Sequence, residues 1–216
     1  MGKGRAYPVS DGGYMAAGMS LFDAAIYWQQ RGLKGAEKWV LCNDKWISLA
    51  FSQMALETNN FTSPLWIQNG NPVGMGFPNS RQLYQVPNSY RIADGGRKLA
   101  RYENARDPVG KSGLTIPVGI VDYVGRLIQI GGNPCDRKDI VKRVIGSGFA
   151  EDPNYWQKWR DKYASIFGEK NADEAFGTQK IGPGIIPGLG GPGQTFPLLL
   201  LAVVAGVVIY QLNKEK

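Results

Sequence analysis

The chain has 216 residues, a formal net charge of +7 and no histidine. The lack of histidine excludes Ser-His-Asp triads, histidine metal sites and histidine proton shuttles, so carboxylates and tyrosines must carry any acid–base chemistry. A basic surface suits a polyanion such as the acidic bacterial wall, anionic lipid or nucleic acid. The lysines and arginines are scattered and form no nucleic-acid motif, so we expect no nucleic acid as partner. One domain of about 165 residues, with no metal or organic cofactor, is the expected size of the folded part.

Residues 1–19 are rich in glycine and small residues, and they lack the apolar run of a secretory signal peptide. This composition predicts an irregular N-terminal arm. Ser20 can cap a first helix that ends at Gly32, and a second helical stretch runs from about Gly35 into Cys42.

A third helix is predicted to end at Glu57, because apolar residues upstream recur at spacings of three and four. Asn43 or Asp44 can cap its start, and Asn59 or Asn60 can take the left-handed conformation that ends it. Glu57 then lies in the last turn among apolar neighbours, where the helix dipole also disfavours negative charge. Both effects raise the pKa of Glu57. The general acid of glycosidic bond cleavage must stay protonated near neutral pH, so Glu57 suits that role.

A long loop over residues 62–79 follows, dense in asparagine, glycine and proline. Its aromatic Trp66 can stack on sugar rings. Next, the segments 82–92 and 98–102 predict a small β-hairpin around an Asp-Gly turn at Asp94.

The chain then returns to helix, with Thr115 as the cap and Pro117 in the first turn. Two further helices open at Asn-Pro and Asp-Pro pairs and are predicted over residues 133–146 and 152–168. The side chain before the proline caps the helix, and the proline loses no donor in the first turn.

The two cysteines, Cys42 and Cys135, are too few for a disulfide framework and have no companion ligands for zinc. A bridge between them would join two core elements. We expect the alternative, which is two buried free thiols.

The composition changes at residue 169. Residues 169–195 are predicted to be a linker, because residues 182–193 are mostly glycine and proline. The uncharged segment 196–212 would span about 25 Å as a helix, which is within the range of membrane helices, and it is followed by a charged tail over residues 213–216. A single-pass C-terminal membrane anchor is the prediction, with a buried core helix as the alternative.

Three blocks of sequence resemble the flagellar-type β-N-acetylglucosaminidases, a family of peptidoglycan hydrolases with a lysozyme-like core. The first is the Ala-Leu-Glu-Thr run at residues 55–58, preceded by Gln53 and followed by Ser63 and by Asn71 of an Asn-x-x-Gly turn. The second is Asp-Tyr-Val-Gly within residues 121–127, and the third is Gly-Phe-Ala-Glu-Asp-Pro-Asn-Tyr at residues 148–155. The family's Gly-Trp-Gly after the first block is replaced here by Asn-Asn-Phe.

The resemblance implies a mainly α-helical, lysozyme-like domain over residues 20–168 with a small β-hairpin lobe. It implies that Glu57 is the general acid and that a second carboxylate comes from the lobe, where Asp94 and Glu103 are the candidates. As alternatives, Asp94 is a turn former and Glu103 a surface charge. In the family a tyrosine lines the cleft near the glutamate, and Tyr155 corresponds to it unless it only packs.

The candidate substrate-binding residues are Gln53, Ser63, Trp66, Asn71 and Tyr123. Two of them have structural alternatives: Asn71 can instead hold the loop, and Tyr123 can instead pack in the core.

The expected function is hydrolysis of the β-1,4-glycan of peptidoglycan by a membrane-tethered enzyme. A lytic transglycosylase or muramidase on the same fold is the first alternative. A non-catalytic, membrane-anchored protein that binds the wall is the second, and the altered residues after Thr58 favour it. A phage with a lipid layer in its virion, or a bacterial membrane, would suit such an anchor. The expected partners are glycan strands and lipid, and the sequence carries no signal that identifies a protein partner.

Overall fold

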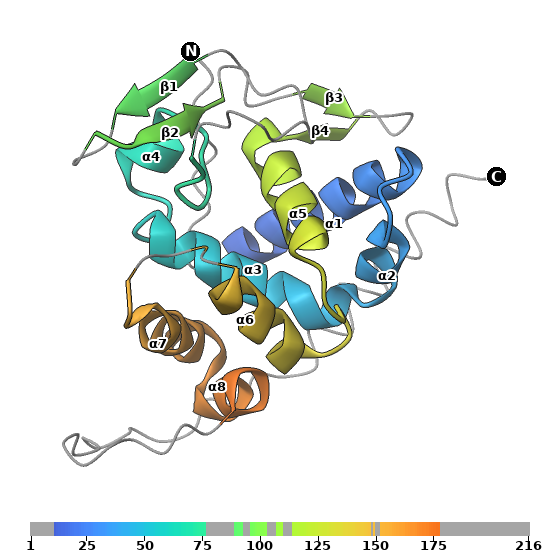
Figure 1. Ribbon diagram of the computed structural model, residues 1–216, viewed down its shortest axis with the longest axis vertical. Coiled ribbons are helices and arrows are strands. Elements are labelled where there is room, and N and C mark those ends of the chain that lie inside the picture. Colours follow the sequence, from blue (N-terminus) through green and yellow to red (C-terminus); the bar gives the residue numbers. More distant parts are fainter. Residues whose placement is uncertain are drawn as a thin grey trace.

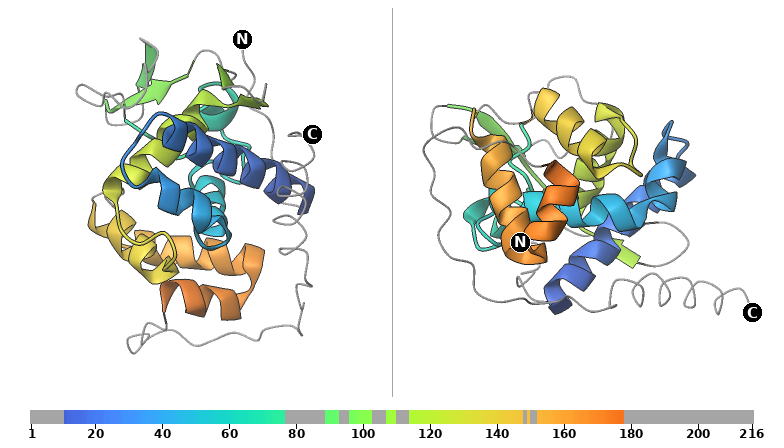
Figure 2. Two further views of the ribbon diagram at one scale, coloured as in Figure 1. Left: turned by 90° about the vertical axis from the view of Figure 1, so that its right-hand side faces the viewer. Right: turned by 90° about the horizontal axis from the view of Figure 1, so that it is seen from below.

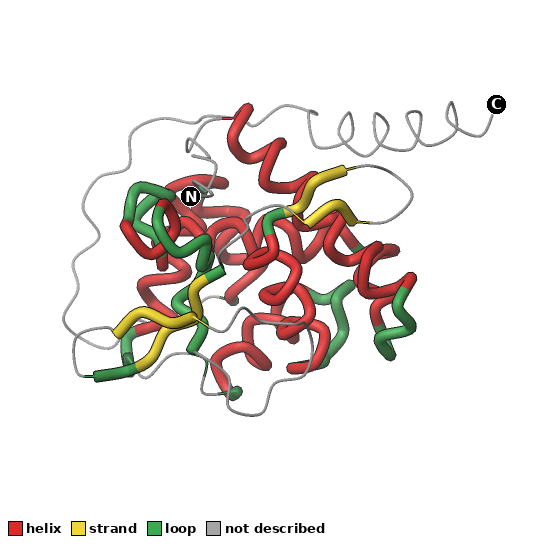
Figure 3. The backbone as a smooth tube through the Cα atoms, turned by 90° about the horizontal axis from the view of Figure 1, so that it is seen from above, coloured by secondary structure: helices red, strands yellow, loops and turns green. Residues whose placement is uncertain are grey.

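The computed structural model describes residues 11–76, 89–92, 96–102, 107–109, 114–147, 149 and 152–177. These residues are mainly helical with two small antiparallel sheets, which confirms the mainly α prediction. Both sheets lie at one end of the molecule, and α7 and α8 lie at the other (Figures 1 and 2). Seen from the sheet end, the two strand pairs are separate patches over the helices (Figure 3).

In chain order the elements are α1 Asp11–Gln30, α2 Ala36–Leu41, α3 Asn43–Glu57, α4 Pro64–Ile67, β1 Ser89–Ile92, β2 Lys98–Arg101, β3 Asp107–Val109, β4 Leu114–Ile116, α5 Val118–Ile130, α6 Arg137–Gly146, α7 Tyr155–Phe167 and α8 Glu169–Phe176.

The first helix begins at Asp11, so the prediction of an irregular arm over residues 1–19 is wrong from Asp11 onward. Tertiary packing explains the difference. The ring of Tyr14 lies edge-on to the rings of Phe51 and Phe167, with centroids 5.1 Å from each. Such contacts outweigh the poor helix propensity of the glycines in this stretch. The first ten residues lie outside the described part of the chain.

The predicted linker over residues 169–195 is wrong at its start, because α8 occupies Glu169 to Phe176. The guanidinium of Arg160 on α7 binds the carboxylates of Glu169 and Asp173 at 2.9 and 2.7 Å. Phe176 is buried, so α8 closes the helical end of the domain rather than leading away from it. The rest of the predicted linker and the segment 196–212 lie outside the described residues.

Polar side chains of α3 face aromatic side chains of α7 in a regular, antiparallel series. The three α7 residues are spaced by four along the helix, so they share one face. The hydrogen-bonded pairs are Ser48 with Tyr163 at 3.1 Å, Ser52 with Trp159 at 2.9 Å, and Gln53 with Tyr155 at 2.9 Å.

Three predicted helix starts are displaced. Ser20 lies within α1, which begins at Asp11. Asp136 rather than Asn133 caps α6, and α7 begins at Tyr155, three residues after Asp152.

Two further predicted caps are also wrong. The Asn43 side chain donates to the carbonyl of Val40 at 3.1 Å, and α3 starts without a side-chain cap from Asn43 or Asp44. Thr115 belongs to β4, and α5 starts directly after Pro117, whose fixed φ suits the position. Thr115 therefore pairs in a strand and does not cap the helix.

The predicted hairpin is confirmed by the pairing of β1 with β2, which runs from Ser89 opposite Arg101 to Ile92 opposite Lys98. The turn that contains Asp94 lies outside the described residues. A second pair, β3 with β4, was not predicted, because each strand has only three residues.

Helix α5 packs closely on α1 through a glycine. The indole of Trp28 donates to the carbonyl of Val121 at 2.7 Å, and a Cβ added at Gly125 would lie 2.7 Å from that indole ring. Only glycine allows this approach, which fixes the face of α5 that turns toward α3.

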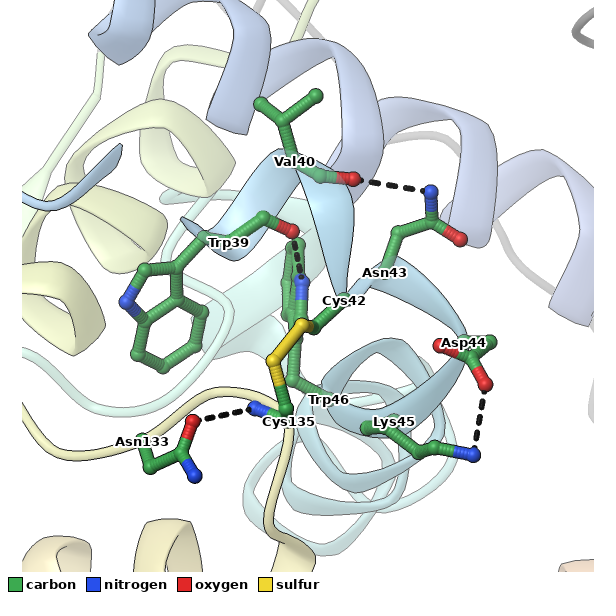
Figure 4. The surroundings of a disulfide bond; sticks show 9 residues. All are labelled: Trp39, Val40, Cys42, Asn43, Asp44, Lys45, Trp46, Asn133 and Cys135. Atoms are coloured by element: carbon green, nitrogen blue, oxygen red, sulfur yellow. Dashed lines mark hydrogen bonds and ion pairs between the residues drawn. A yellow bond between two sulfur atoms is a disulfide. The ribbon is translucent and has the colours of Figure 1, made fainter. Parts of the chain in front are cut away.

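Cys42 and Cys135 form a disulfide across 93 residues, with Cα atoms 5.0 Å apart (Figure 4). The expectation of free thiols is therefore wrong. Cys42 sits between α2 and α3, where the Trp46 indole donates to the carbonyl of Trp39 at 2.7 Å, and Cys135 is exposed just before α6. Tertiary packing brings Cys42 and Cys135 together, and local sequence patterns cannot predict such a contact.

Within the described ranges, none of the helices has the length and apolar character needed to cross a membrane. The anchor predicted over residues 196–212 falls outside those ranges and stays a prediction.

Candidate active site

Glu57 is the last residue of α3 and is half-buried, as the sequence predicts. Burial raises the pKa of its carboxyl above the usual value. The turn after the loop comes close to it, since a Cβ added at Gly74 would lie 3.8 Å from Glu57 Oε2 and 3.9 Å from the Leu65 side chain. A glycine here therefore leaves space beside the carboxyl.

Three consecutive residues with positive φ end α3 and set the direction of the chain after Glu57. Asn59, Asn60 and Phe61 have φ values of 48°, 56° and 64°. The two asparagines confirm the prediction, while Phe61 is unusual because a left-handed residue with a large side chain costs about 1–2 kcal/mol. The Phe61 ring is buried against Phe51 and Trp66, which offsets this cost.

A chain of hydrogen bonds reaches Glu57 from two other helices. The Tyr123 hydroxyl donates to Gln53 Oε1 at 2.6 Å, Gln53 Nε2 donates to the Tyr155 hydroxyl at 2.9 Å, and that hydroxyl bonds to the Glu57 carboxyl. An ionised carboxylate can only accept hydrogen bonds, so the Tyr155 hydroxyl must donate to Glu57. The Tyr155 oxygen is then the acceptor for Gln53, and Gln53 in turn accepts from Tyr123. Gln53 and Tyr123 are fully buried, so this order is protected from water.

The surroundings of the two tyrosines in this hydrogen-bond chain keep their hydroxyl groups protonated. Burial raises the pKa of both Tyr155 and Tyr123, and the nearby charge of Glu57 raises them further. Conversely, the Tyr155 hydrogen bond and the charge of Arg97 each partly counter the raised pKa of Glu57. Tyr155 is therefore a positioning residue that stabilises the ionised form of the acid.

Arg97 is a site residue that sequence reasoning missed. It precedes β2 and is exposed, yet its guanidinium acts electrostatically on Glu57 some forty residues earlier in the chain. No spacing pattern links the two positions. Only the pairing of the hairpin beside the end of α3 brings them together.

Asn71 holds the loop rather than contacting sugar. Its buried amide Nδ2 donates to the carbonyls of Met75 and Ala100 at 2.9 and 3.0 Å, and its Oδ1 accepts from the Met75 amide at 2.9 Å. These bonds fix the turn that contains Gly74 and join it to β2.

Burial corrects three other predicted substrate contacts. Trp66, Gln53 and Tyr123 each have 0% exposure, so none can touch a glycan. The aromatic residue of the loop turned inward because the left-handed turn points Phe61 and Trp66 at one another in the core. Ser63 is half-buried at the start of α4, and among the described residues its Oγ has no hydrogen-bond partner.

The second carboxylate stays a prediction, since Asp94 and Glu103 lie outside the described residues. A different acid, Asp122, is fully buried and accepts from the Tyr102 hydroxyl at 2.5 Å. This bond ties the end of β2 to α5 and so supports the lobe beside Glu57.

In the described ranges no group of three or more carboxylate or cysteine side chains is placed to hold a metal ion. Comparisons of the chain with protein-family models, curated proteins and solved structures find no match. Function must therefore be inferred from the site.

Proposed function

We propose that the chain is a peptidoglycan hydrolase that cleaves the β-1,4-glycan with Glu57 as general acid. The observation that carries this proposal is the state of Glu57, a half-buried carboxyl whose pKa is raised by burial and whose ionised form is met by a donated hydroxyl. A carboxyl whose pKa is raised keeps its proton to higher pH than an exposed glutamate does, and it can release that proton to a leaving oxygen.

The placement of the three family-like blocks supports the proposal. Gln53 and Glu57 come from the first block, Tyr123 from the second and Tyr155 from the third, and these four side chains form the hydrogen-bond chain. Segments that resemble one family thus meet at the residue expected to be its acid. On the same ground we propose that the helical domain, with its hairpin beside the end of α3, is lysozyme-like.

In the proposed reaction the Glu57 proton moves to the glycosidic oxygen as the bond between that oxygen and the anomeric carbon breaks. The sugar ring gains positive charge, water then adds its hydroxyl to the anomeric carbon, and the remaining proton of that water restores the acid form of Glu57. The new carboxylate is stabilised by the Tyr155 hydrogen bond and by the charge of Arg97. The group that balances the charge on the sugar is Asp94, Glu103 or the N-acetyl group of the substrate.

Purified peptidoglycan sacs test the proposal. The wild-type chain should release soluble fragments, and Glu57→Gln should not. Mass analysis of the new ends separates a reducing N-acetylglucosamine from the reducing muramic acid of a muramidase and the anhydro ring of a transglycosylase. Binding without release would instead assign a non-catalytic wall-binding protein.

The proposed enzyme is tethered through residues 196–212, in the membrane of a phage virion or of a bacterium. Carbonate extraction of membranes should leave the full chain in the pellet. A chain that ends after Gly177, which retains α8, should be soluble. Release of both chains would contradict the tether and leave the proposed chemistry intact.

A further inference from the structure

The Cys42–Cys135 disulfide joins two segments that are each held in place by their own hydrogen bonds (Figure 4). On one side, the backbone amide of Cys135 donates to the Asn133 side chain at 3.2 Å, and the Asp136 side chain caps α6. On the other side, the backbone amide of Cys42 donates to the carbonyl of Lys38 at 3.0 Å and closes the last turn of α2. None of these hydrogen bonds involves a sulfur atom, so neither segment depends on the disulfide for its local structure.

A noncovalent link lies beside the disulfide. The guanidinium of Arg137 donates from Nε to the carbonyl of Lys45 at 3.2 Å and from Nη2 to the carbonyl of Asp44 at 3.2 Å. Arg137 follows Cys135 by two residues, and the two carbonyls follow Cys42 by two and three residues. The start of α6 is therefore held against the start of α3 by hydrogen bonds as well as by the covalent bond.

The two sulfur atoms belong to residues that differ in access to solvent. Cys135 is exposed, whereas Cys42 is half-buried between α2 and α3. A disulfide is cleaved when an external thiolate attacks one of its sulfur atoms, and the rate of attack depends on access to that atom. Attack at Cys135 is therefore favoured, with Cys42 as the leaving sulfur.

We propose that this disulfide is a thiol–disulfide exchange site that opens and closes while the domain stays folded, and that an external dithiol attacks it at Cys135. The attacking thiolate forms a mixed disulfide with Cys135 Sγ, and the Cys42 sulfur leaves and takes up a proton. The second thiol of the reagent then displaces Cys135, which becomes a thiol, and the reagent becomes a disulfide. Two electrons and two protons have moved from the dithiol to the two cysteines.

The exchange couples the domain to the redox state of its surroundings. Thiols are kept reduced in the cytosol, whereas disulfides persist in oxidising compartments. We expect the chain to carry two thiols where it is synthesised and to close the disulfide outside the cytosol. Cys42 lies just before α3, the helix that ends at Glu57, so this helix gains its covalent tie only after the chain has left the cytosol. This inference does not depend on the proposed function.

Reduction by dithiothreitol separates attack on the folded domain from attack on the unfolded chain. The full wild-type chain in nonionic detergent is mixed with increasing dithiothreitol, and free thiols are counted over time by mass spectrometry after alkylation. Attack on the folded domain should give a rate proportional to the dithiothreitol concentration and changed less than about twofold by dilute urea. A rate that levels off with dithiothreitol and rises steeply with urea would show that the disulfide opens only on unfolding, which overturns the proposal.

Peptide mapping identifies the sulfur that is attacked. Brief treatment of the wild-type chain with reduced glutathione, followed by acid quenching, should leave glutathione on Cys135. In the single-cysteine variants, Cys135 in Cys42→Ser should react with glutathione disulfide at least about tenfold faster than Cys42 in Cys135→Ser, and the two rates should agree within about twofold in concentrated urea. Glutathione found mainly on Cys42, or equal rates in the folded variants, would contradict the assignment of Cys135.

Reoxidation tests the link through Arg137. Once reduced and freed of reductant, the wild-type chain should close the disulfide with glutathione disulfide about threefold or more faster than Arg137→Gln does. The matched control is Lys138→Gln, which removes the same charge from the next residue, an exposed position on α6. Equal closure of Arg137→Gln and Lys138→Gln would show that the guanidinium does not hold the two thiols together.

Rapid alkylation of intact bacteria that express the chain tests the coupling to the compartment. Both thiols should be alkylated in chains retained in the cytosol, and neither should be alkylated in chains exported behind a cleavable signal peptide. Bridged chains in the cytosol, or exported chains with two free thiols, would contradict this coupling.

Discussion

The Tyr155 hydroxyl donates a hydrogen bond to the carboxyl group of Glu57, although the two residues lie on separate helices, α7 and α3. The donor cannot turn away, because Gln53 occupies its acceptor side at 2.9 Å. Two opposing influences therefore act on one acid: burial favours its proton, and the tyrosine favours its loss. Substitutions that remove one influence at a time measure how much each contributes to the pKa of Glu57.

Replacing Glu57 with Gln keeps the shape and removes the transferable proton, so glycan cleavage should fall by about 10² to 10⁴. In the wild-type chain cleavage should decline as the pH rises through the raised pKa of Glu57, because only the protonated carboxyl is active. Release of reducing ends from sacs across a pH series measures both effects. Cleavage by Glu57→Gln at near the wild-type rate would exclude this residue as the acid.

The same substitution has a predicted effect on stability. The folded state holds the Glu57 proton more tightly than the unfolded state does. The protonated carboxyl therefore adds to the free energy of unfolding below the pKa of the unfolded state, and this stabilisation is lost as the pH rises through the pKa of the folded state. Glu57→Gln should therefore match the wild type in acid and be more stable above that range. Burial also raises the pKa of Asp23 to about 6, with the same sign. Urea unfolding of Asp23→Asn, Glu57→Gln and the double variant separates the two groups.

Tyr155→Phe should move the descending limb of the activity profile to higher pH, because the hydrogen bond that favours the ionised acid is gone. It should also cost about 1–3 kcal/mol of stability, since the buried Gln53 amide loses its acceptor. Tyr123→Phe is the control, as it removes a buried donor to Gln53 without touching Glu57. If the descending side of the pH–activity profile stays in place in Tyr155→Phe, or moves equally in Tyr123→Phe, then Tyr155 does not lower the pKa of Glu57 as assigned.

Arg97→Gln should also move the limb to higher pH, because the guanidinium lowers the pKa of Glu57. Its side chain is exposed, so stability should change by no more than about 0.5 kcal/mol. High salt should bring the wild-type profile toward that of the variant, since it screens the arginine. A shift that salt does not reduce would point to a change in structure instead.

Loss of the disulfide should destabilise the fold by about 4–5 kcal/mol, the chain-entropy value for a closed loop of this length. Urea unfolding with and without reductant measures the difference, and Cys42→Ser with Cys135→Ser gives the same state without reductant. The reductant should not affect the double variant. Identical unfolding midpoints for oxidised and reduced wild type would show that the bridge contributes nothing.

Local rules predicted the features that depend on neighbouring residues. The end of α3 at Glu57, the left-handed Asn59 and Asn60, and the pairing of β1 with β2 follow from helix periodicity and turn chemistry. The three motif blocks contain the residues of the hydrogen-bond chain that reaches Glu57, but the sequence assigned Gln53 and Tyr123 to substrate binding, and their complete burial makes that assignment wrong.

Features that depend on tertiary packing could not be predicted. Tyr14 extends α1 by packing on Phe51, and nothing in the glycine-rich start announces that contact. Trp66 in a polar loop looks like a sugar platform, yet the left-handed turn before it directs the ring into the core. Arg97 reaches Glu57 only because the hairpin folds back beside the helix end.

The disulfide closes the chain from Cys42 to Cys135 into a covalent ring that contains Gln53, Glu57 and Tyr123. Tyr155 lies outside this ring, on a helix held to it by packing and by hydrogen bonds such as that between Ser52 and Trp159. Helices α7 and α8 can thus open while the ring stays closed. Their amide hydrogens should exchange faster than those of α3 and α5, and each opening would uncouple the acid from its hydroxyl partner without unfolding the helix that carries the acid.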